Sequence, residues 1–153
     1  MTRTDSASLL VHAAPDAVFA ALTDADALAA WLPPAGMHGR FERFDMRTGG
    51  GFRMVLTYDD ATDAPGKSSA DEDVSDVRIV RIDPGERIVQ EVEFVSDDPA
   101  FHGTMRMTWT LRSVGDGTVV EVRAEGVPSG IGARDHAEGI TSSLVNLAGH
   151  LER

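Results

Sequence analysis

The stretch that decides the fold class is Met105-Arg106-Met107-Thr108-Trp109-Thr110-Leu111. Its large apolar side chains alternate with polar ones, which is the pattern of a strand with one buried and one solvated face. Similar alternation occurs in 52–58, 88–94 and 120–124. Turn sequences rich in glycine, aspartate and proline separate these segments, a further strand is predicted over 41–47, and loops are predicted over 59–73 and 96–101. They therefore predict an antiparallel sheet of six to seven strands.

Helical patterns flank this sheet on both sides. A first strand over 8–12 is followed by two short helices, one opened by Pro15 and the other ended by Pro33-Pro34. At the other end of the chain, an apolar stripe at helical spacing consists of Ala137, Ile140, Leu144, Leu147, Ala148 and Leu151. This helix is long enough to cover the apolar face of the sheet. We therefore predict an α+β fold in which a curved antiparallel sheet wraps around a long C-terminal helix.

Composition limits the classes of function. The 153 residues fit a single domain over 1–153, and the absence of cysteine excludes disulfides and thiol chemistry. The formal net charge of -11 disfavours nucleic acids and anionic membranes as partners. No apolar run approaches the ~20 residues of a membrane span, and the N-terminus lacks the apolar core of a signal peptide. We predict a cytoplasmic protein.

The order of these elements is similar to that of the START-like helix-grip superfamily, also called SRPBCC. Within it, the chain resembles the family named after the activator of the heat-shock protein 90 ATPase. The resemblance rests on 18–24 with Leu28 and Trp31, on 44–50 with Phe52, on 81–89, and on Leu144, Leu147 and Leu151. In one departure, Ile140 follows Gly139 where the family usually has a tryptophan. The resemblance implies a helix-grip fold with an internal cavity, whose wall differs at that position. It implies no reaction, because the superfamily includes lipid carriers, hormone receptors, aromatic cyclases and co-chaperone domains.

The inward positions of the predicted sheet and helices supply the candidate ligand-binding residues. Large apolar residues are usually ordinary core, but as a set they suit a small-molecule site, which is mostly apolar with few polar groups. Methionines add adaptability to such a wall. Gln90 is the polar member, and a buried amide needs a partner, which a ligand, a water or the backbone would supply. The candidates are Trp31, Phe52, Met54, Leu56, Gln90, Val92, Phe94, Met105, Met107, Trp109 and Leu144.

Other motifs argue against catalytic and metal chemistry. The five histidines, His12, His38, His102, His136 and His150, are scattered without metal-site spacing, so we expect neither a metal nor a cofactor. No Gly-x-Ser-x-Gly motif is present. Asp45 and Arg47 are interpreted as an ion pair on a hairpin. Gly49-Gly50-Gly51 lacks the lysine and the context of a phosphate loop.

Three functions remain in competition. The preferred hypothesis is a carrier, sensor or sequestering module for a small hydrophobic molecule, acting without catalysis as a monomer or homodimer. The alternative is a cyclase or dehydratase-type enzyme that uses the same cavity, in which Gln90, His38 or His102 moves protons. The third is a co-chaperone-like interaction domain, which predicts a large exposed apolar patch. The sequence does not identify the ligand.

Overall fold

The computed structural model describes residues 3–34, 36–59 and 72–152. Within these residues, seven strands, three α-helices and one short 3-10 helix follow the predicted order. The elements are β1 (Thr4–Val11), α1 (Pro15–Thr23), α2 (Ala25–Trp31), β2 (Met37–Asp45), β3 (Gly51–Tyr58), β4 (Glu72–Asp83), β5 (Arg87–Phe94), η1 (Pro99–Phe101), β6 (Met105–Val114), β7 (Gly117–Glu125) and α3 (Ala133–Leu151).

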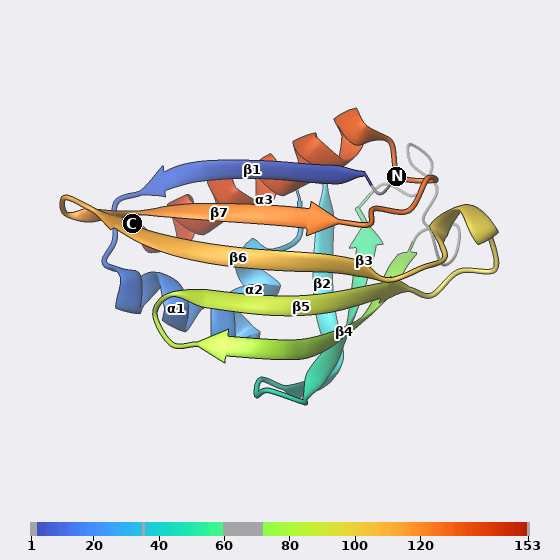
Figure 1. Cartoon of the computed structure of the whole chain (residues 1–153), viewed down its shortest axis with the longest axis horizontal. Coiled ribbons are helices and arrows are strands. Elements are labelled where there is room, and N and C mark those ends of the chain that lie inside the picture. The colour runs from blue at the N-terminus through green and yellow to red at the C-terminus, as the bar shows by residue number, and fades with distance from the viewer. Residues whose placement is uncertain (1–2, 35, 60–71, 153) are drawn as a thin grey trace.

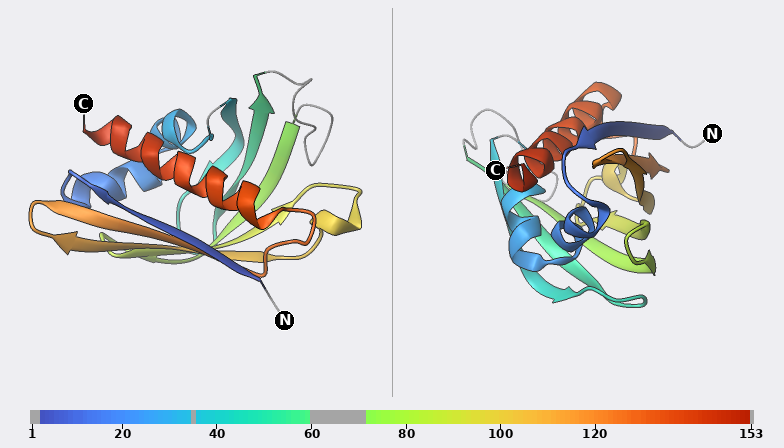
Figure 2. Two further views of the ribbon diagram at one scale, coloured as in Figure 1. Left: turned by 90° about the horizontal axis from the view of Figure 1, so that it is seen from above. Right: turned by 90° about the vertical axis from the view of Figure 1, so that its left-hand side faces the viewer.

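All seven strands form one antiparallel sheet in the order β1-β7-β6-β5-β4-β3-β2. The sheet bends sharply, so that β2 and β3 stand at a steep angle to β5, β6 and β7 (Figures 1 and 2). Two breaks in register accompany the bend, between Phe41 and Arg43 in β2 and between Ile79 and Arg81 in β4. Such bulges bend a strand locally and increase its twist. The bent sheet partly surrounds α3, which confirms the predicted helix-grip arrangement.

Local chemistry sets the ends of the two short helices. Pro15 occupies the first turn of α1, where its missing N–H leaves no hydrogen bond unmade. Asp24 ends α1 and begins α2, and its carboxylate accepts a hydrogen bond of 2.9 Å from the amide nitrogen of Ala27. This shared cap joins the helices directly. They pack together beside α3 at one end of the sheet (Figure 2).

Polar contacts hold α3 in place from two sides. At its first turn, the imidazole Nδ1 of His136 lies 2.8 Å from the carboxylate of Asp5 in β1. Further along, the hydroxyl of Ser143 donates to the carbonyl of Leu32 at 2.6 Å, and the amide of Asn146 donates to the carbonyl of Pro33 at 2.9 Å. The helix also packs against β1, α1 and α2. It is therefore anchored along one edge of the concave surface and does not lie flat across all the strands.

The apolar core consists of two clusters. The first, between the helices and β1, β5, β6 and β7, includes Val11, Trp31, Ile88, Trp109 and Leu147. The second lies under the steep part of the sheet and includes Phe52, Met54, Val77, Val92 and Met105. The two clusters thus pack the two ends of the space between the bent sheet and α3.

Several element boundaries differ from those predicted. Strand β1 begins at Thr4 rather than Ser8, and β2 runs from Met37 to Asp45 rather than from 41 to 47. The predicted loop over 96–101 contains the 3-10 helix η1. Most of the predicted loop over 59–73 lies outside the described residues. Across the described ranges, the helices are all too short or too polar to cross a membrane.

Candidate ligand cavity

A cavity of about 280 Å³ lies between the two core clusters. Its floor is the concave face of β3, β4, β5 and β6, and α2 and α3 form the opposite side. The apolar part of its lining is Leu22, Leu28, Leu32, Pro34, Met37, Phe52, Met54, Leu56, Val77, Ile88, Val92, Phe94, Met105, Met107, Trp109, Val122, Ile131 and Ile140. An engineered cavity of about 150 Å³ is enough to bind benzene, so this one has room for a larger guest.

The cavity persists because of the side chains that α3 turns toward it. These are Asp135, His136, Gly139, Ile140 and Ser143. Gly139 contributes no side chain, and a Cβ added there would have no other atom within 4 Å. The large residues of α3 that are fully buried, Leu144 and Leu147, belong instead to the first core cluster. Small and polar residues on one side of the helix therefore leave the space that leucines would fill.

Most of the residues predicted from the sequence line this cavity. They are Phe52, Met54, Leu56, Gln90, Val92, Phe94, Met105, Met107 and Trp109. Trp31 and Leu144 are each 1% exposed and are not part of the lining. The Trp31 ring instead packs edge-on against Trp109, with centroids 5.7 Å apart, and its Nε1 donates to the carbonyl of Ala21 at 2.8 Å. Trp31 thus packs against the lining residue Trp109 without lining the cavity itself.

Gln90 is one of two polar groups that the floor strands contribute to the lining, the other being Ser75 of β4, apart from Asp73 at the start of β4. It is 9% exposed, and its Oε1 accepts a hydrogen bond of 3.2 Å from Nε1 of Trp109. An indole N–H only donates, so the amide oxygen must face Trp109 and the amide nitrogen must face away from it. Among the described residues, that nitrogen has no hydrogen-bond partner, yet it is not sealed from accessible space. Its two N–H groups are therefore available to an acceptor inside the cavity.

A second group of polar residues lines the cavity near the end of β3 and the beginning of α3. Asp73 is 4% exposed, and its carboxylate accepts a hydrogen bond of 3.3 Å from the phenol of Tyr58. Asp135 lies in the first turn of α3, where a negative charge is favoured by the helix dipole. Burial and the charges of Asp73 and Asp135 raise the pKa of Tyr58 to about 12. This end of the cavity is called the acidic end below.

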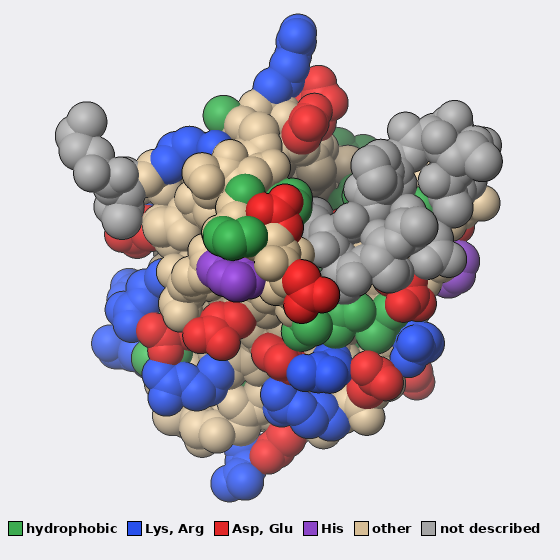
Figure 3. Space-filling model, turned by 90° about the vertical axis from the view of Figure 1, so that its right-hand side faces the viewer, with side chains coloured by type: hydrophobic (Ala, Val, Ile, Leu, Met, Phe, Trp, Pro, Cys, Tyr) green, Lys and Arg blue, Asp and Glu red, His purple; other side chains and the backbone are tan. Residues whose placement is uncertain are grey.

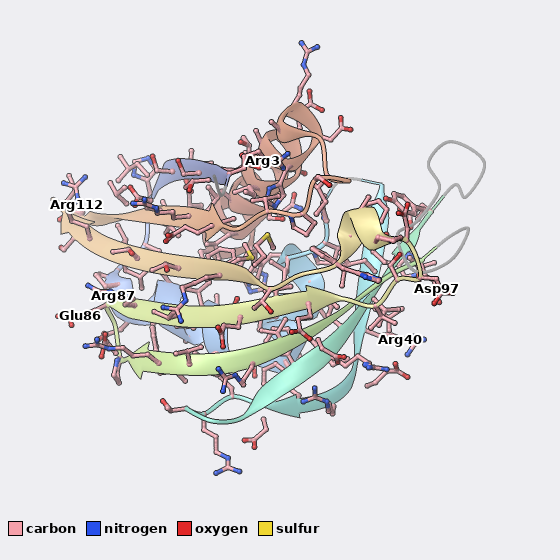
Figure 4. All side chains as sticks on the ribbon, turned by 45° about the vertical axis from the view of Figure 1, so that its right-hand side comes forward. Arg3, Arg40, Glu86, Arg87, Asp97 and Arg112 are labelled. Atoms are coloured by element: carbon pink, nitrogen blue, oxygen red, sulfur yellow. The ribbon has the colours of Figure 1, made fainter. Side chains whose placement is uncertain are left out.

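Sequence reasoning missed His136, which lines the cavity and pairs with Asp5. Burial alone would raise the pKa of Asp5, but hydrogen bonds from His136 and Arg3 outweigh it and hold that pKa below its usual value. Arg3 lies beside α3 (Figure 4). The two histidines that the sequence suggested for proton transfer, His38 and His102, lie elsewhere. His38 pairs with Asp59, His102 lies 2.7 Å from the carbonyl of Ser96, and neither lines the cavity.

The convex side of the sheet is charged. Arg53 makes two hydrogen bonds to Asp76, and Glu91 pairs with both Arg78 and Arg106. Of these residues, Asp76, Arg78 and Glu91 line an open hollow of about 720 Å³, which also includes 49–51. Labelled charged side chains such as Arg40, Arg87 and Arg112 extend away from the sheet into solvent (Figure 4). The pairing of opposite charges leaves little there to select a ligand. The predicted Asp45–Arg47 ion pair is present nearby, at 2.8 Å.

Two other features bear on the competing functions. Across 3–34, 36–59 and 72–152, histidine and acidic side chains nowhere gather in threes that would hold a metal ion. On the face shown in Figure 3, where β3 ends and α3 begins, hydrophobic side chains form small groups between charged ones. The large hydrophobic residues that are more exposed, Leu10, Val95, Val114 and Val145, come from four separate segments. These described surfaces do not match the large apolar patch that a co-chaperone-like domain predicts.

Comparison with known proteins places the chain in a family. The model of the family described as "Activator of Hsp90 ATPase homolog 1-like protein" matches residues 12–152. Protein CV1439 from Chromobacterium violaceum is 30% identical, with a TM-score of 0.86 over 98% of this chain and 97% of that one. Protein Mll3558 from Rhizobium loti is 26% identical, with a TM-score of 0.75 over 99% and 98%.

A more distant structure shares the fold. DynU16, a putative protein in the dynemicin biosynthetic locus, is 21% identical, with a TM-score of 0.70 over 97% of this chain and 47% of that one. No curated protein matches the sequence. The family match covers nearly the whole chain and confirms the resemblance drawn from its motifs. The chain belongs to the Activator of Hsp90 ATPase homolog 1-like family, within the START-like helix-grip superfamily.

Proposed function

We propose that this protein binds a small, mostly apolar molecule in the cavity between the concave face of the sheet and α3. The observation that carries the proposal is the amide of Gln90. It lies among apolar side chains, and its nitrogen has no hydrogen-bond partner among the described residues. A hydrogen bond made by such a donor contributes about 1 kcal/mol net, because it replaces a hydrogen bond to water. A ligand that brings an acceptor oxygen to this nitrogen gains that free energy.

The size and lining of the cavity support the same proposal. Its volume of about 280 Å³ is at the lower end of small-molecule sites, and its lining is mainly apolar with a few polar groups. Phe52, Met54 and Trp109 supply broad apolar contacts, while Met105 and Met107 adapt to an irregular guest. A bicyclic aromatic molecule is a suitable guest by comparison with the roughly 150 Å³ that accommodates benzene.

Two matched probes test the proposal by isothermal titration calorimetry. 2-Acetylnaphthalene and 2-ethylnaphthalene have nearly the same shape, but only the ketone accepts a hydrogen bond. We expect both to bind, the ketone about fivefold more tightly because one hydrogen bond is worth about 1 kcal/mol. Gln90→Met, which keeps the volume and removes the amide, should abolish the difference. Failure of both probes to bind wild-type protein would refute the proposal.

A second candidate, an acid–base enzyme using the same cavity, is favoured by His136. Its Nδ1 is held by Asp5 at 2.8 Å while the residue lines the cavity. A carboxylate that fixes one imidazole nitrogen is the arrangement that prepares the other for proton transfer. NMR of the imidazole resonances during titration with 2-acetylnaphthalene tests this role. Resonances that do not shift at saturation would show that His136 does not contact the occupant, and would remove the candidate.

A further inference from the structure

The amide of Gln90 has one orientation because of its contact with Trp109. Gln90 lies in β5 and Trp109 in β6, the next strand of the sheet (Figure 1). The Nε1 of Trp109 donates to Oε1 of Gln90 at 3.2 Å, and both side chains are buried. An amide turned by 180° would bring the indole N–H against the amide NH₂, and neither of these groups accepts a hydrogen bond. The contact therefore holds the oxygen toward Trp109 and the nitrogen away from it.

The residues beside Gln90 in the sheet offer the amide little alternative. Gln90 is opposite Ile79 in β4 and Met107 in β6. Isoleucine has no hydrogen-bonding side-chain group, and a thioether sulfur is only a weak acceptor. Among the described residues, Trp109 is the one whose side chain bonds to the amide of Gln90. The orientation of this amide therefore depends on Trp109 within the part of the chain that the structure describes.

Trp109 is itself held in place by a residue of α2. The ring of Trp31 packs edge-on against it, with centroids 5.7 Å apart and an angle of 79° between the ring planes. Trp31 is 1% exposed, and its own Nε1 donates to the carbonyl of Ala21 in α1 at 2.8 Å. Close packing leaves a buried ring few other rotamers. The indole N–H of Trp109 is thus kept on Gln90 by contacts that reach back to α1.

We propose that Trp109 is a positioning residue that determines which ligands bind, because it keeps the N–H groups of Gln90, and not the carbonyl oxygen, turned toward the cavity. This inference rests on the function proposed above and adds the residue that sets its specificity. The ligand is then an apolar molecule whose polar group at the cavity floor is an acceptor, such as a ketone or a quinone. A molecule whose only polar group is an N–H donor gains no bond from Gln90, although a carboxylate at the acidic end can still accept from it.

Three bicyclic probes of nearly the same size separate these chemistries. 1-Indanone has only an acceptor, indole has only a donor, and indane has neither. By isothermal titration calorimetry, we expect wild-type protein to bind 1-indanone about fivefold more tightly than indane, because one hydrogen bond contributes roughly that factor. Indane is the reference for the other two, so a variant that changes only the packing changes all three affinities together.

Trp109→Phe removes the indole N–H and frees the amide of Gln90 to turn either way. Its carbonyl can then accept from indole, so we expect the indanone-to-indole affinity ratio to fall at least about threefold. Met107→Leu is the matched control, because Met107 lines the cavity directly opposite Gln90 and its replacement leaves the Trp109–Gln90 hydrogen bond in place. The control should leave the ratio unchanged.

A measurement on wild-type protein covers the case in which Trp109→Phe does not fold. During NMR titration with 1-indanone, the side-chain amide resonances of Gln90 should shift more than the indole N–H resonance of Trp109, because the amide donates to the ketone. A larger shift of the indole resonance would show that Trp109 itself donates to the ketone, and would overturn the proposal.

The calorimetric outcomes distinguish this inference from the proposed function. An unchanged ratio in a folded Trp109→Phe variant, or an equal fall in Met107→Leu, would overturn the role of Trp109. Binding of 1-indanone and indane in that case would leave the proposed function standing. If none of the three probes binds wild-type protein, the proposed function fails and this inference fails with it.

Discussion

Replacing Gly139 with leucine should close the cavity without damaging the fold. Gly139 lines the cavity from α3, and an added Cβ there meets no atom within 4 Å. A leucine side chain removed from a core leaves about 150 Å³, so one added here would occupy roughly half of the 280 Å³. We expect the affinity for 2-acetylnaphthalene to fall at least tenfold, because a guest of this size can no longer enter fully.

The same substitution should stabilise the protein. Glycine is less favourable than leucine inside a helix by about 0.8 kcal/mol, and partial burial of the new side chain adds about 1 kcal/mol more. For a domain of this size, a gain of about 2 kcal/mol raises Tm by roughly 4–8 °C. Lost binding would therefore accompany a higher Tm, the opposite of what a damaged fold would give.

Gly149→Leu is the matched control, because Gly149 lies in the same helix, is exposed and also has no atom within 4 Å of an added Cβ. It should raise Tm by about 2–4 °C through helix propensity alone and leave affinity unchanged. Calorimetric titration and thermal unfolding measure the two quantities. A folded Gly139→Leu variant that binds the probe with wild-type affinity would refute the reasoning, since the probe would then bind somewhere else.

Three further changes test the structure around the cavity. Trp31→Ala should lower the free energy of unfolding by about 3–5 kcal/mol in urea denaturation, because it leaves a cavity behind Trp109; a loss under 1 kcal/mol would contradict this packing. Gly51→Ala should cost at least about 2 kcal/mol, because its Cβ would overlap the carbonyl oxygen of Val77, and wild-type stability would show that the strands separate easily. Tyr58 is the single tyrosine, so absorbance titration reports it directly. Because its pKa is raised, the contribution of Tyr58 to stability is full below about pH 10 and is lost as the pH rises through about 12. Ionisation of Tyr58 near pH 10 in the folded protein would show that burial and the charges of Asp73 and Asp135 do not act on it.

Alternation in the sequence predicted the faces of the strands well. In 88–94 and 105–111, every second residue faces the concave side because side chains on a strand alternate with a period of two. The same rule correctly placed Gln90 inward, where a shift of one residue would have exposed it. The start of β1 was missed because its first residues, such as Thr4 and Ser6, are exposed and polar. Half-exposed strand ends carry little hydrophobic signal.

Depth within the core could not be predicted in this way. Trp31 and Leu144 have the same inward pattern as the lining residues, but they are buried behind it, and their part in ligand binding stays a prediction. Periodicity gives the side on which a residue lies, not its distance from the cavity. The bulges in β2 and β4 insert a residue without a sequence signal. They help to bend the sheet.

The polar part of the lining depends on contacts between distant segments. His136 meets Asp5, which lies 131 residues earlier in the chain, and no local spacing links them. A weaker signal did exist in α3, where the small residues Gly139 and Ser143 are spaced by four beside the large apolar stripe. Small residues at helical spacing place little volume on one side of a helix, so they point to a cavity once the fold is known.

Strand β2 is an edge strand of the sheet, and its exposed edge affects whether a second molecule can pair with it. Its outward side chains include Arg40, Glu42 and Arg43, and its backbone is irregular between Phe41 and Arg43. A second molecule that tried to continue the sheet here would have to desolvate these charges and follow a kinked template. This edge of the sheet is therefore a poor template for open-ended pairing between molecules.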